Sequence, residues 1–318
     1  MSAHTPVCEL LGIEHPIVLA PLATDPRLPA AVSDAGGLGS LGLSWSDDAG
    51  EVVRETAALT DRPFAGNFVL FEDQHRRVDQ ALSAGLRVVS LIWGDPCSYV
   101  ESVHDAGGLV VHTVGSAEEA RRAVGCGVDI IIAQGWEAGG HVWGGVATLP
   151  LVPAVVDAVA PVPVIAAGGI GDARGVAAVF ALGAQAALLG TRFLLAVEMP
   201  IHEEYRHHLI AANETDAEWY PDLYDVGWPD APHRALHNST AEMWEAAGRP
   251  PLGSRPKEGE VIAHFASGDP ILRYSPAPPM VGTTGEIEAL SQWAGQSVAL
   301  AKQPQPAAEI ISELVSHL

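Results

Sequence analysis

The stretch Pro163–Leu194, PVIAAGGIGDARGVAAVFALGAQAALLGTRFL, is the part of the sequence that decides the fold. It predicts a buried strand, a loop with paired glycines, a helix, and a second buried strand that ends at Gly190 and Thr191. Glycine lets the main chain approach a ligand closely, and the loops after the last two strands of a (β/α)8 barrel lie side by side. We therefore expect Gly168, Gly169, Gly190 and Thr191 to hold a phosphate group.

Similar apolar runs recur along the chain with amphipathic segments between them. Eight strands are predicted, at Pro16–Ala20, Gly39–Leu41, Phe64–Leu70, Val88–Leu91, Leu109–Thr113, Val128–Ala133, Pro163–Ala167 and Ala186–Leu189. Most do not alternate apolar and polar residues, as expected for strands covered on both faces. This pattern predicts an α/β fold, a (β/α)8 TIM barrel. An open doubly wound sheet is the alternative, but the loop after the first strand lacks the GxGxxG pattern.

The composition and periodicity of the sequence change after residue 200. Residues 201–280 are rich in Trp, His, Pro and Glu, show weak periodicity, and are too long for an ordinary loop. We predict an inserted, mainly helical lid subdomain over the barrel, which itself comprises residues 1–200 and 281–318. Thr284–Ala301 is predicted as the closing barrel helix and Ala308–Leu318 as a short terminal helix.

Composition limits the classes of function. The 318 residues are 48% hydrophobic and carry a formal net charge of −22, which disfavours nucleic acid and anionic membranes as partners. The three cysteines are widely spaced and form no CxxC pair, so we expect reduced thiols and no metal site. The first residues lack a basic region followed by an apolar run, and we expect a cytoplasmic protein.

A second motif, AQGWEAGGHVWGG at Ala133–Gly145, follows a predicted buried strand. It brings polar residues and glycines to the end of that strand, where barrel enzymes place their catalytic groups. His141 is the candidate general base because its ordinary pKa lies near neutral pH. A histidine that only caps a loop carbonyl is the structural alternative. Glu137 is expected to orient a backbone amide or to pair with Arg192.

Together these motifs resemble the nitronate monooxygenase family of FMN-dependent barrel enzymes. The resemblance covers residues 8–200 and 282–318, and it includes IEHPIVLAPLATDPRLPAAVSDAGGLGSLGL at Ile13–Leu43, RPFAGNFVL around Asn67, and WAGQSV around Gln296. It implies FMN as the cofactor and His141 as the catalytic residue. The implied FMN-binding residues are Ala20, Pro21, Leu22, Asn67, Gln134, Gly139, Gly168, Gly169, Gly190, Thr191 and Gln296.

The resemblance implies oxidation of alkyl nitronates or nitroalkanes by O2 to a carbonyl compound and nitrite, with His141 as base or substrate-positioning residue. An NAD(P)H-dependent flavin reductase acting on quinones or enoyl thioesters is the alternative. A non-catalytic module that binds a phosphorylated ligand is a third hypothesis, disfavoured by a histidine within a glycine loop.

One departure from the family concerns the substrate pocket. Many nitronate monooxygenases carry a histidine in a VSFHFG-like stretch after strand four, whereas this chain has Ile92 at that place in VSLIWG. Trp93, Trp136 and Trp143 are predicted to line the pocket, which suits a bulky or flat substrate better than a small anion. The Trp-rich insertion is a candidate surface for a homodimer.

Overall fold

The computed structural model describes residues 4–318. Eight parallel strands form one sheet in the order β1-β9-β8-β6-β5-β4-β3-β2. The two ends of this sheet meet through a parallel bridge between Val18 and Leu38, where Leu19 N donates to Leu38 O at 2.9 Å. The strands are β1 (Ile17–Leu19), β2 (Gly39–Gly42), β3 (Phe64–Val69), β4 (Val88–Ile92), β5 (Leu109–Val114), β6 (Ile130–Gln134), β8 (Val164–Ala167) and β9 (Ala186–Leu189). The predicted (β/α)8 barrel and its eight strands are confirmed.

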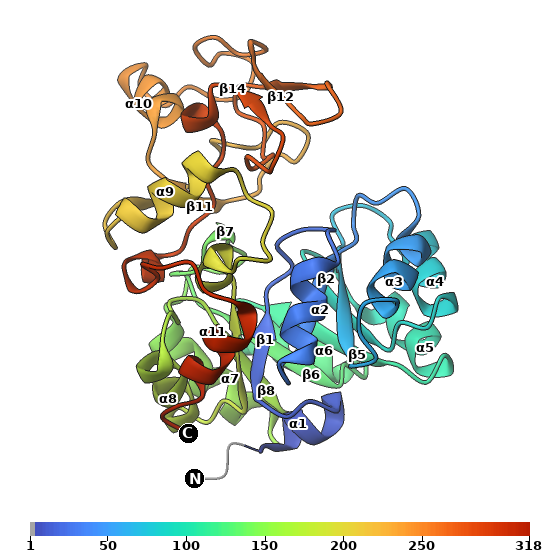
Figure 1. Cartoon of the computed structure of the whole chain (residues 1–318). Helices are drawn as coiled ribbons and strands as arrows, with labels where there is room; N and C mark the ends of the chain where they lie inside the picture. The colour runs from blue at the N-terminus through green and yellow to red at the C-terminus, as the bar shows by residue number, and fades with distance from the viewer. Residues whose placement is uncertain (1–3) are drawn as a thin grey trace.

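Helices cover the outside of the barrel (Figure 1). They are α2 (Arg27–Asp34), α3 (Ala49–Ala57), α4 (His75–Ser83), α5 (Cys97–Asp105), α6 (Ala117–Gly125), α7 (Thr148–Val159), α8 (Ala173–Ala181) and α11 (Ala307–Leu314). Their apolar faces and the outward side chains of the strands form one large core cluster. Both faces of the strands are therefore buried, which explains why the strand sequences are mostly apolar and do not alternate.

A short helix, α1 (Pro6–Leu11), closes the lower end of the barrel (Figure 1). Thr5 caps its first turn, and Gly12 ends it with φ +69°. Val7, Cys8 and Leu11 pack with inward side chains of the strands in a second core cluster. The site must consequently be built at the opposite end, where the strands have their carboxyl ends.

The inserted segment lies above those carboxyl ends (Figure 1). It folds into α9 (Glu203–Ala211), β10 (Ala217–Tyr220), β11 (His233–Leu236), α10 (Ser239–Ala246), β12 (Val261–His264) and β13 (Pro270–Leu272). The prediction of a mainly helical segment was wrong, because these strands complete two three-stranded sheets. Their partners β7 (Gly140–His141) and β14 (Thr284–Gly285) lie outside the insertion, so the pairing is not visible in the local sequence.

The predicted closing helix at Thr284–Ala301 was also wrong. That stretch contains β14 and two short 3-10 turns, η2 (Ile287–Ala289) and η3 (Gln296–Leu300). Its main chain lies against β11 and the loop between β6 and β7: Ala294 N donates to Arg234 O and Gln296 N donates to Glu137 O. A helix would have used these amides internally. The terminal helix α11 instead packs against α2 and α8 and completes the outer layer.

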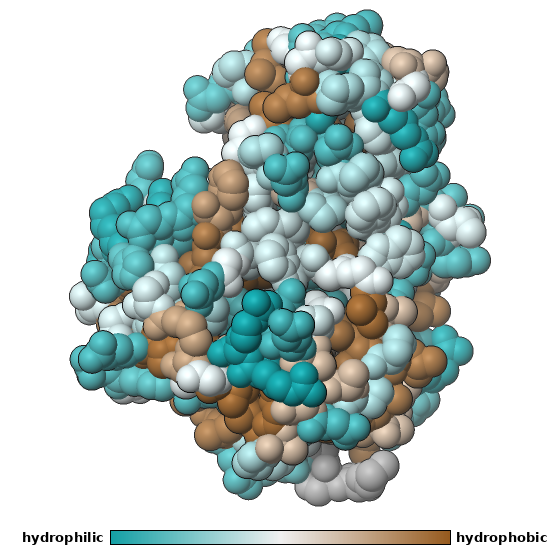
Figure 2. Space-filling model, turned by 180° about the vertical axis from the view of Figure 1, so that it is seen from behind, coloured by the Kyte–Doolittle hydropathy of each residue, from teal (hydrophilic) through white to brown (hydrophobic). Residues whose placement is uncertain are grey.

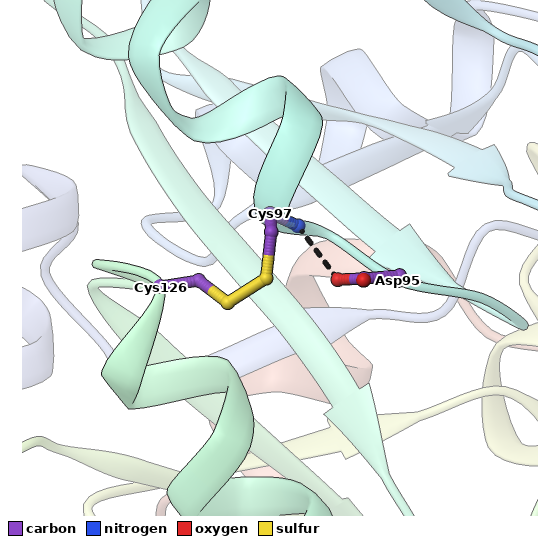
Figure 3. Close-up of side chains that lie close together, drawn as sticks. All are labelled: Asp95, Cys97 and Cys126. Atoms are coloured by element: carbon purple, nitrogen blue, oxygen red, sulfur yellow. Dashed lines mark hydrogen bonds between the residues drawn. A yellow bond between two sulfur atoms is a disulfide. The ribbon is translucent and has the colours of Figure 1, made fainter.

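The expectation of three reduced thiols was wrong as well. Cys97, the first residue of α5, and Cys126, just after α6, are joined by a disulfide (Figure 3). Asp95 accepts a hydrogen bond from the Cys97 amide at 3.0 Å beside it. The two cysteines are 29 residues apart in sequence, and only the packing of neighbouring barrel helices brings them together. Cys8 is a free, buried thiol.

Hydrophobic residues are distributed unevenly over the surface of the molecule (Figure 2). Figure 2 shows the molecule from behind, where hydrophobic residues gather mainly on the barrel part and the insertion is largely polar. Among the described residues, no helix is long and apolar enough to cross a membrane.

Candidate active site

The glycine loops after β8 and β9 form one side of the barrel mouth. Gly168 and Gly169 have φ angles of +93° and +73°, a region that side-chain-bearing residues rarely adopt. The main-chain N–H groups of Gly168, Gly169 and Gly190 donate to no described residue. All three glycines keep some exposure to solvent. Because β8 and β9 are neighbours in the sheet, these loops together offer free donors to an anion.

The start of α8, by contrast, is not free to bind an anion. Asp172 caps this helix, and its carboxylate accepts hydrogen bonds from the amides of Arg174 and Gly175. The Arg174 guanidinium also pairs with Asp172, and this hydrogen bond is the main reason that the pKa of Asp172 is lowered. A phosphate at this end of the barrel would therefore depend on the glycine loops rather than on the helix.

The segment around Gln296 crosses the same loops. Thr191 accepts a hydrogen bond from Gly295 N at 2.9 Å, and Gln296 N donates to Glu137 O at 3.1 Å. The Gln296 side-chain amide makes no hydrogen bond to any described residue. The structure thus brings the predicted residues Thr191 and Gln296 together beside the glycine loops that follow β8 and β9.

The loop after β1 lies against this side too. Ala20 N donates to Leu189 O at 2.9 Å. A Cβ atom added to Gly190 would lie 3.3 Å from Ala20 Cβ and 3.5 Å from Leu22 Cδ2, so the loop Ala20-Pro21-Leu22 directly adjoins Gly190. These contacts place predicted cofactor residues that follow β1 and β9, the first and last strands of the barrel, next to each other.

Asn67 lies farther round the barrel on β3. It is buried, and its Oδ1 accepts a hydrogen bond from Ser90 Oγ at 3.1 Å. Its amide nitrogen donates to none of the described residues. Ser90 therefore fixes the orientation of the amide, and the nitrogen stays available to a ligand.

Gln134, Glu137 and Gly139 hold the loop that carries His141. Gln134 Nε2 donates to His141 O at 3.1 Å, and Gln134 Oε1 accepts from Trp143 N at 2.9 Å. Glu137 accepts from the amide and the hydroxyl of Thr148, so it orients a backbone amide as expected and does not pair with Arg192. Gly139 has a packing role, because a Cβ atom there would lie 2.3 Å from Gly295 N.

His141 lies in β7 at the other side of the mouth and is surrounded by aromatic rings. Its imidazole stacks on Trp228 with 3.9 Å between ring centroids and 27° between planes. Trp93 and Trp293 approach it at 5.8 Å and 5.3 Å. Its Nε2 atom is enclosed and has no hydrogen-bond partner among the described residues. The enclosed nitrogen and its aromatic walls are therefore the chemical centre of this side.

Burial determines the charge of His141. Desolvation, with a smaller contribution from His233, lowers the pKa of His141 to about 3. The imidazole is therefore neutral at neutral pH and can accept a proton or a hydrogen bond. An anion formed next to Nε2 would favour the imidazolium, because an opposite charge at short distance raises a histidine pKa. Proton uptake is thus coupled to the appearance of a negative charge beside the ring.

The three tryptophans predicted to line the pocket lie in two different places in the structure. Trp93 and Trp143 meet at 4.9 Å and line the His141 cluster. Trp136 does not reach it: its ring lies 4.3 Å from the Arg234 guanidinium carbon. Arg234 Nη2 also donates to Trp136 O at 3.0 Å, which anchors the insertion to the barrel loop.

Sequence reasoning missed the ring that covers His141. Trp228 lies over His141 because β11 pairs with β7, with His233 opposite His141. His233 itself is structural: Nδ1 donates to Ala231 O at 2.9 Å and Nε2 accepts from Tyr224 N at 3.1 Å. The sequence Gly227-Trp228-Pro229 indicates a turn at a tryptophan, but it does not reveal the distant strand against which the ring packs.

A polar cluster in the insertion lies apart from this site. Potential ligand atoms of Glu218, His237 and Glu245 lie within 4.8 Å of one another. Glu245 already pairs with His237 at 3.3 Å and with Arg249 at 2.6 Å. We interpret the cluster as an ion-pair network that joins β10, β11 and α10.

The barrel mouth fits a flat cofactor that carries a phosphate. The free glycine amides suit the phosphate, while the side-chain amides of Asn67 and Gln296 are unused donors at the mouth. A (β/α)8 barrel with free main-chain amides and an enclosed histidine at its mouth has the features of a ligand-binding barrel enzyme.

Comparison with known proteins narrows this class to a family. The family model described as nitronate monooxygenase matches residues 4–76 and 69–317. The chain therefore belongs to the nitronate monooxygenase family and is a flavin-dependent oxidoreductase.

Individual relatives show two kinds of activity. A nitronate monooxygenase of Paraburkholderia phytofirmans is 33% identical over 97% of this chain and 93% of its own length. A (3aS,4S,5R,7aS)-5-hydroxy-7a-methyl-1-oxo-octahydro-1H-indene-4-carboxyl-CoA dehydrogenase of Mycobacterium tuberculosis is 36% identical over 78% of this chain and 70% of its own length. The solved structure of FabK from Thermotoga maritima superposes with a TM-score of 0.85 and 33% identity, covering 99% of this chain and 96% of that one.

Proposed function

We propose that this protein is an FMN-dependent oxidase of alkyl nitronates and nitroalkanes that uses O2 and releases a carbonyl compound and nitrite. The observation that carries the proposal is the enclosed His141 Nε2, which has no protein partner and lies among aromatic rings. An aromatic, water-poor pocket with one neutral nitrogen base suits a nitroalkane with an apolar body.

FMN is proposed to bind with its phosphate on the amides of Gly168, Gly169 and Gly190. The amide groups of Asn67 and Gln296 are the proposed side-chain contacts to the rest of the cofactor. FMN would supply the electron chemistry, whereas the protein supplies position and exclusion of water. Gln134 is proposed to act mainly by holding the His141 loop, since both ends of its amide bind that loop.

His141 has two proposed uses. With a neutral nitroalkane, Nε2 takes the proton from the carbon next to the nitro group, and the resulting anion stabilises the imidazolium. With a substrate that is already a nitronate, a protonated Nε2 donates a hydrogen bond to it. The low pKa of about 3 in the ligand-free protein makes the first use dependent on close contact between ring and substrate.

The experiment that tests this function measures O2 uptake and nitrite release on the FMN-loaded protein with 2-propyl nitronate. Nitrite formed in proportion to O2 consumed, with NADH giving no comparable rate, would support the proposal. FMN-loaded protein that releases no nitrite from nitronates or nitroalkanes would contradict it.

A second candidate is a flavin oxidoreductase acting on acyl thioesters. The relative at 36% identity is named as a dehydrogenase of an indene-carboxyl-CoA, which favours this candidate, as does Ile92 at the place of the family's strand-four histidine. NAD(P)H-dependent reduction of an enoyl-CoA by the FMN-loaded protein would establish this candidate. Homodimer formation and a cytoplasmic location stay predictions.

A further inference from the structure

The insertion places an indole N–H at the candidate substrate site. Trp228 lies in the turn between β10 and β11, is 5% exposed, and stacks on His141. It also packs with Val69 and Ala231, with Ile92 and Trp93 against the same cluster. The insertion therefore fills the space above the ends of β3 and β4 with a ring that carries a hydrogen-bond donor.

That donor has no partner in the protein. Trp228 Nε1 is enclosed and bonds to no described residue, and the same is true of His141 Nε2 in the ring stacked on it. Nearby polar groups are already used: Trp143 Nε1 donates to Glu119 at 2.9 Å, and both nitrogens of His233 are bonded. Enclosed donors are normally paired, and a phenylalanine would fill the space without this cost. A ligand atom that accepts a hydrogen bond would satisfy the indole.

The turn that carries Trp228 is held firmly. Trp228 N donates to Asp225 O at 2.9 Å. Arg255 binds the Asp225 carboxylate through two bonds, of 2.6 Å and 3.0 Å, and both side chains are almost fully buried. Gly227 precedes the tryptophan with φ +86°. The indole is therefore presented by a fixed support, which is what a positioning residue requires.

We propose that the Trp228 indole N–H is a positioning donor for a substrate oxygen atom, and that this insertion-borne group takes the place left apolar by Ile92. The expected ligand has an apolar or flat body and a nitro or nitronate oxygen at the indole. This inference rests on the proposed function for the identity of the oxygen. A thioester carbonyl oxygen offers the same acceptor chemistry, and the experiment separates the two.

The test compares Trp228→Phe, which keeps a ring but removes the donor, with Trp45→Phe as the matched control. Trp45 lies 5.4 Å from Trp228, yet it is 60% exposed. For FMN-loaded protein we expect the Kd of 2-propyl nitronate to rise about tenfold in Trp228→Phe, equivalent to about 1.4 kcal/mol. Its FMN content should stay unchanged, and Trp45→Phe should bind within about twofold of the parent protein.

A second readout follows the donor directly. In protein labelled with ¹⁵N at the indole nitrogens, the resonance missing from Trp228→Phe identifies Trp228 and should move downfield when 2-propyl nitronate is added. A Trp228 resonance that moves with neither 2-propyl nitronate nor crotonyl-CoA, or nitronate binding that Trp228→Phe leaves unchanged, would overturn the inference even if nitrite is released. A shift with crotonyl-CoA, without nitrite release from any nitronate, would support the donor role and contradict the nitronate function.

Discussion

The two sides of the barrel mouth present different groups to a ligand. The glycine side, formed by Gly168, Gly169 and Gly190, presents main-chain amides, and the aromatic side, formed by His141, Trp93 and Trp228, presents side chains. At the ends of β8 and β9 the glycine loops expose unused main-chain amides, and a ligand there meets backbone. At the ends of β4 and β6 the mouth is closed by side chains: His141 contacts both Trp93 and Trp228, and these two rings also contact each other at 5.2 Å. The first side suits an anion that many substrates or cofactors share, whereas the second side suits one particular shape. The comparison indicates that cofactor binding and substrate choice can vary independently in this fold.

The largest expected effect is that of His141→Asn, which should reduce turnover without changing FMN binding. Loss of the base should lower kcat/KM for a neutral nitroalkane by about 100-fold or more, the usual range for general base catalysis. FMN binding should be unchanged, because the glycine side is intact. Steady-state nitrite release and the visible spectrum measure the two effects. Full activity on the neutral nitroalkane would remove the base role from His141.

The substitution Gly190→Asp should instead weaken FMN binding and leave the aromatic side unchanged. Gly190 has an ordinary negative φ of −106°, so a side chain adds charge there without forcing a rare backbone conformation. A carboxylate beside the proposed phosphate site should weaken FMN binding by about 100-fold, or about 2.7 kcal/mol.

Fluorescence titration of the apoprotein with FMN measures this affinity. The control is Gly190→Asn, which has nearly the same size and no charge, and it should bind much more tightly than the aspartate variant. Equal binding by the two variants would place the phosphate elsewhere.

A smaller effect is expected at the support of the aromatic side. Gln134→Leu removes both hydrogen bonds to the His141 loop and leaves the His141 carbonyl and the Trp143 amide without that partner. The free energy of unfolding should fall by about 1–3 kcal/mol. Chemical denaturation measures the change, and Gln134→Glu, which keeps the acceptor for Trp143 N, should lose less. A Gln134→Leu protein of parental stability and activity would show that the clamp is dispensable.

The smallest effect is the one expected for a change of a single pH unit. Histidine in an unfolded chain titrates near 6.5, whereas burial lowers the pKa of His141 to about 3. Between these values the unfolded chain binds a proton that the folded protein does not, so stability falls as the pH drops below about 6.5. The loss from this one group is at most about 1.4 kcal/mol per pH unit.

Denaturation curves of the apoprotein from pH 7 to 4.5 measure this loss. His141→Gln should flatten the decline, and His264→Gln, at an exposed position, should leave it unchanged. A parallel decline in the parent protein and His141→Gln would show that His141 is not buried in its neutral form.

The predictability of the two sides differs for a physical reason. The glycine side could be predicted from local sequence, because Gly168, Gly169 and Gly190 directly follow buried strands. The barrel strands could be predicted for the same reason. The roles assigned to His141 and to the cofactor residues stay predictions, although the structure gathers most of them at the mouth.

The aromatic side depends on contacts between distant segments. Trp228 reaches His141 because β11 pairs with β7, 92 residues earlier at the His233–His141 pair. The same long-range pairing explains why the insertion contains sheets and why Thr284–Ala301 is not a helix. The disulfide between Cys97 and Cys126 likewise depends on helix packing that spacing alone does not reveal. Local periodicity carries no information about such contacts.

Anaerobic mixing of the FMN-loaded protein with 2-propyl nitronate or with NADH tests the central claim most directly. We predict that the nitronate alone reduces the flavin, and that it does so more slowly in Trp228→Phe at subsaturating nitronate. Rapid bleaching by NADH with no response to the nitronate would contradict the account and assign the protein to the flavin reductases.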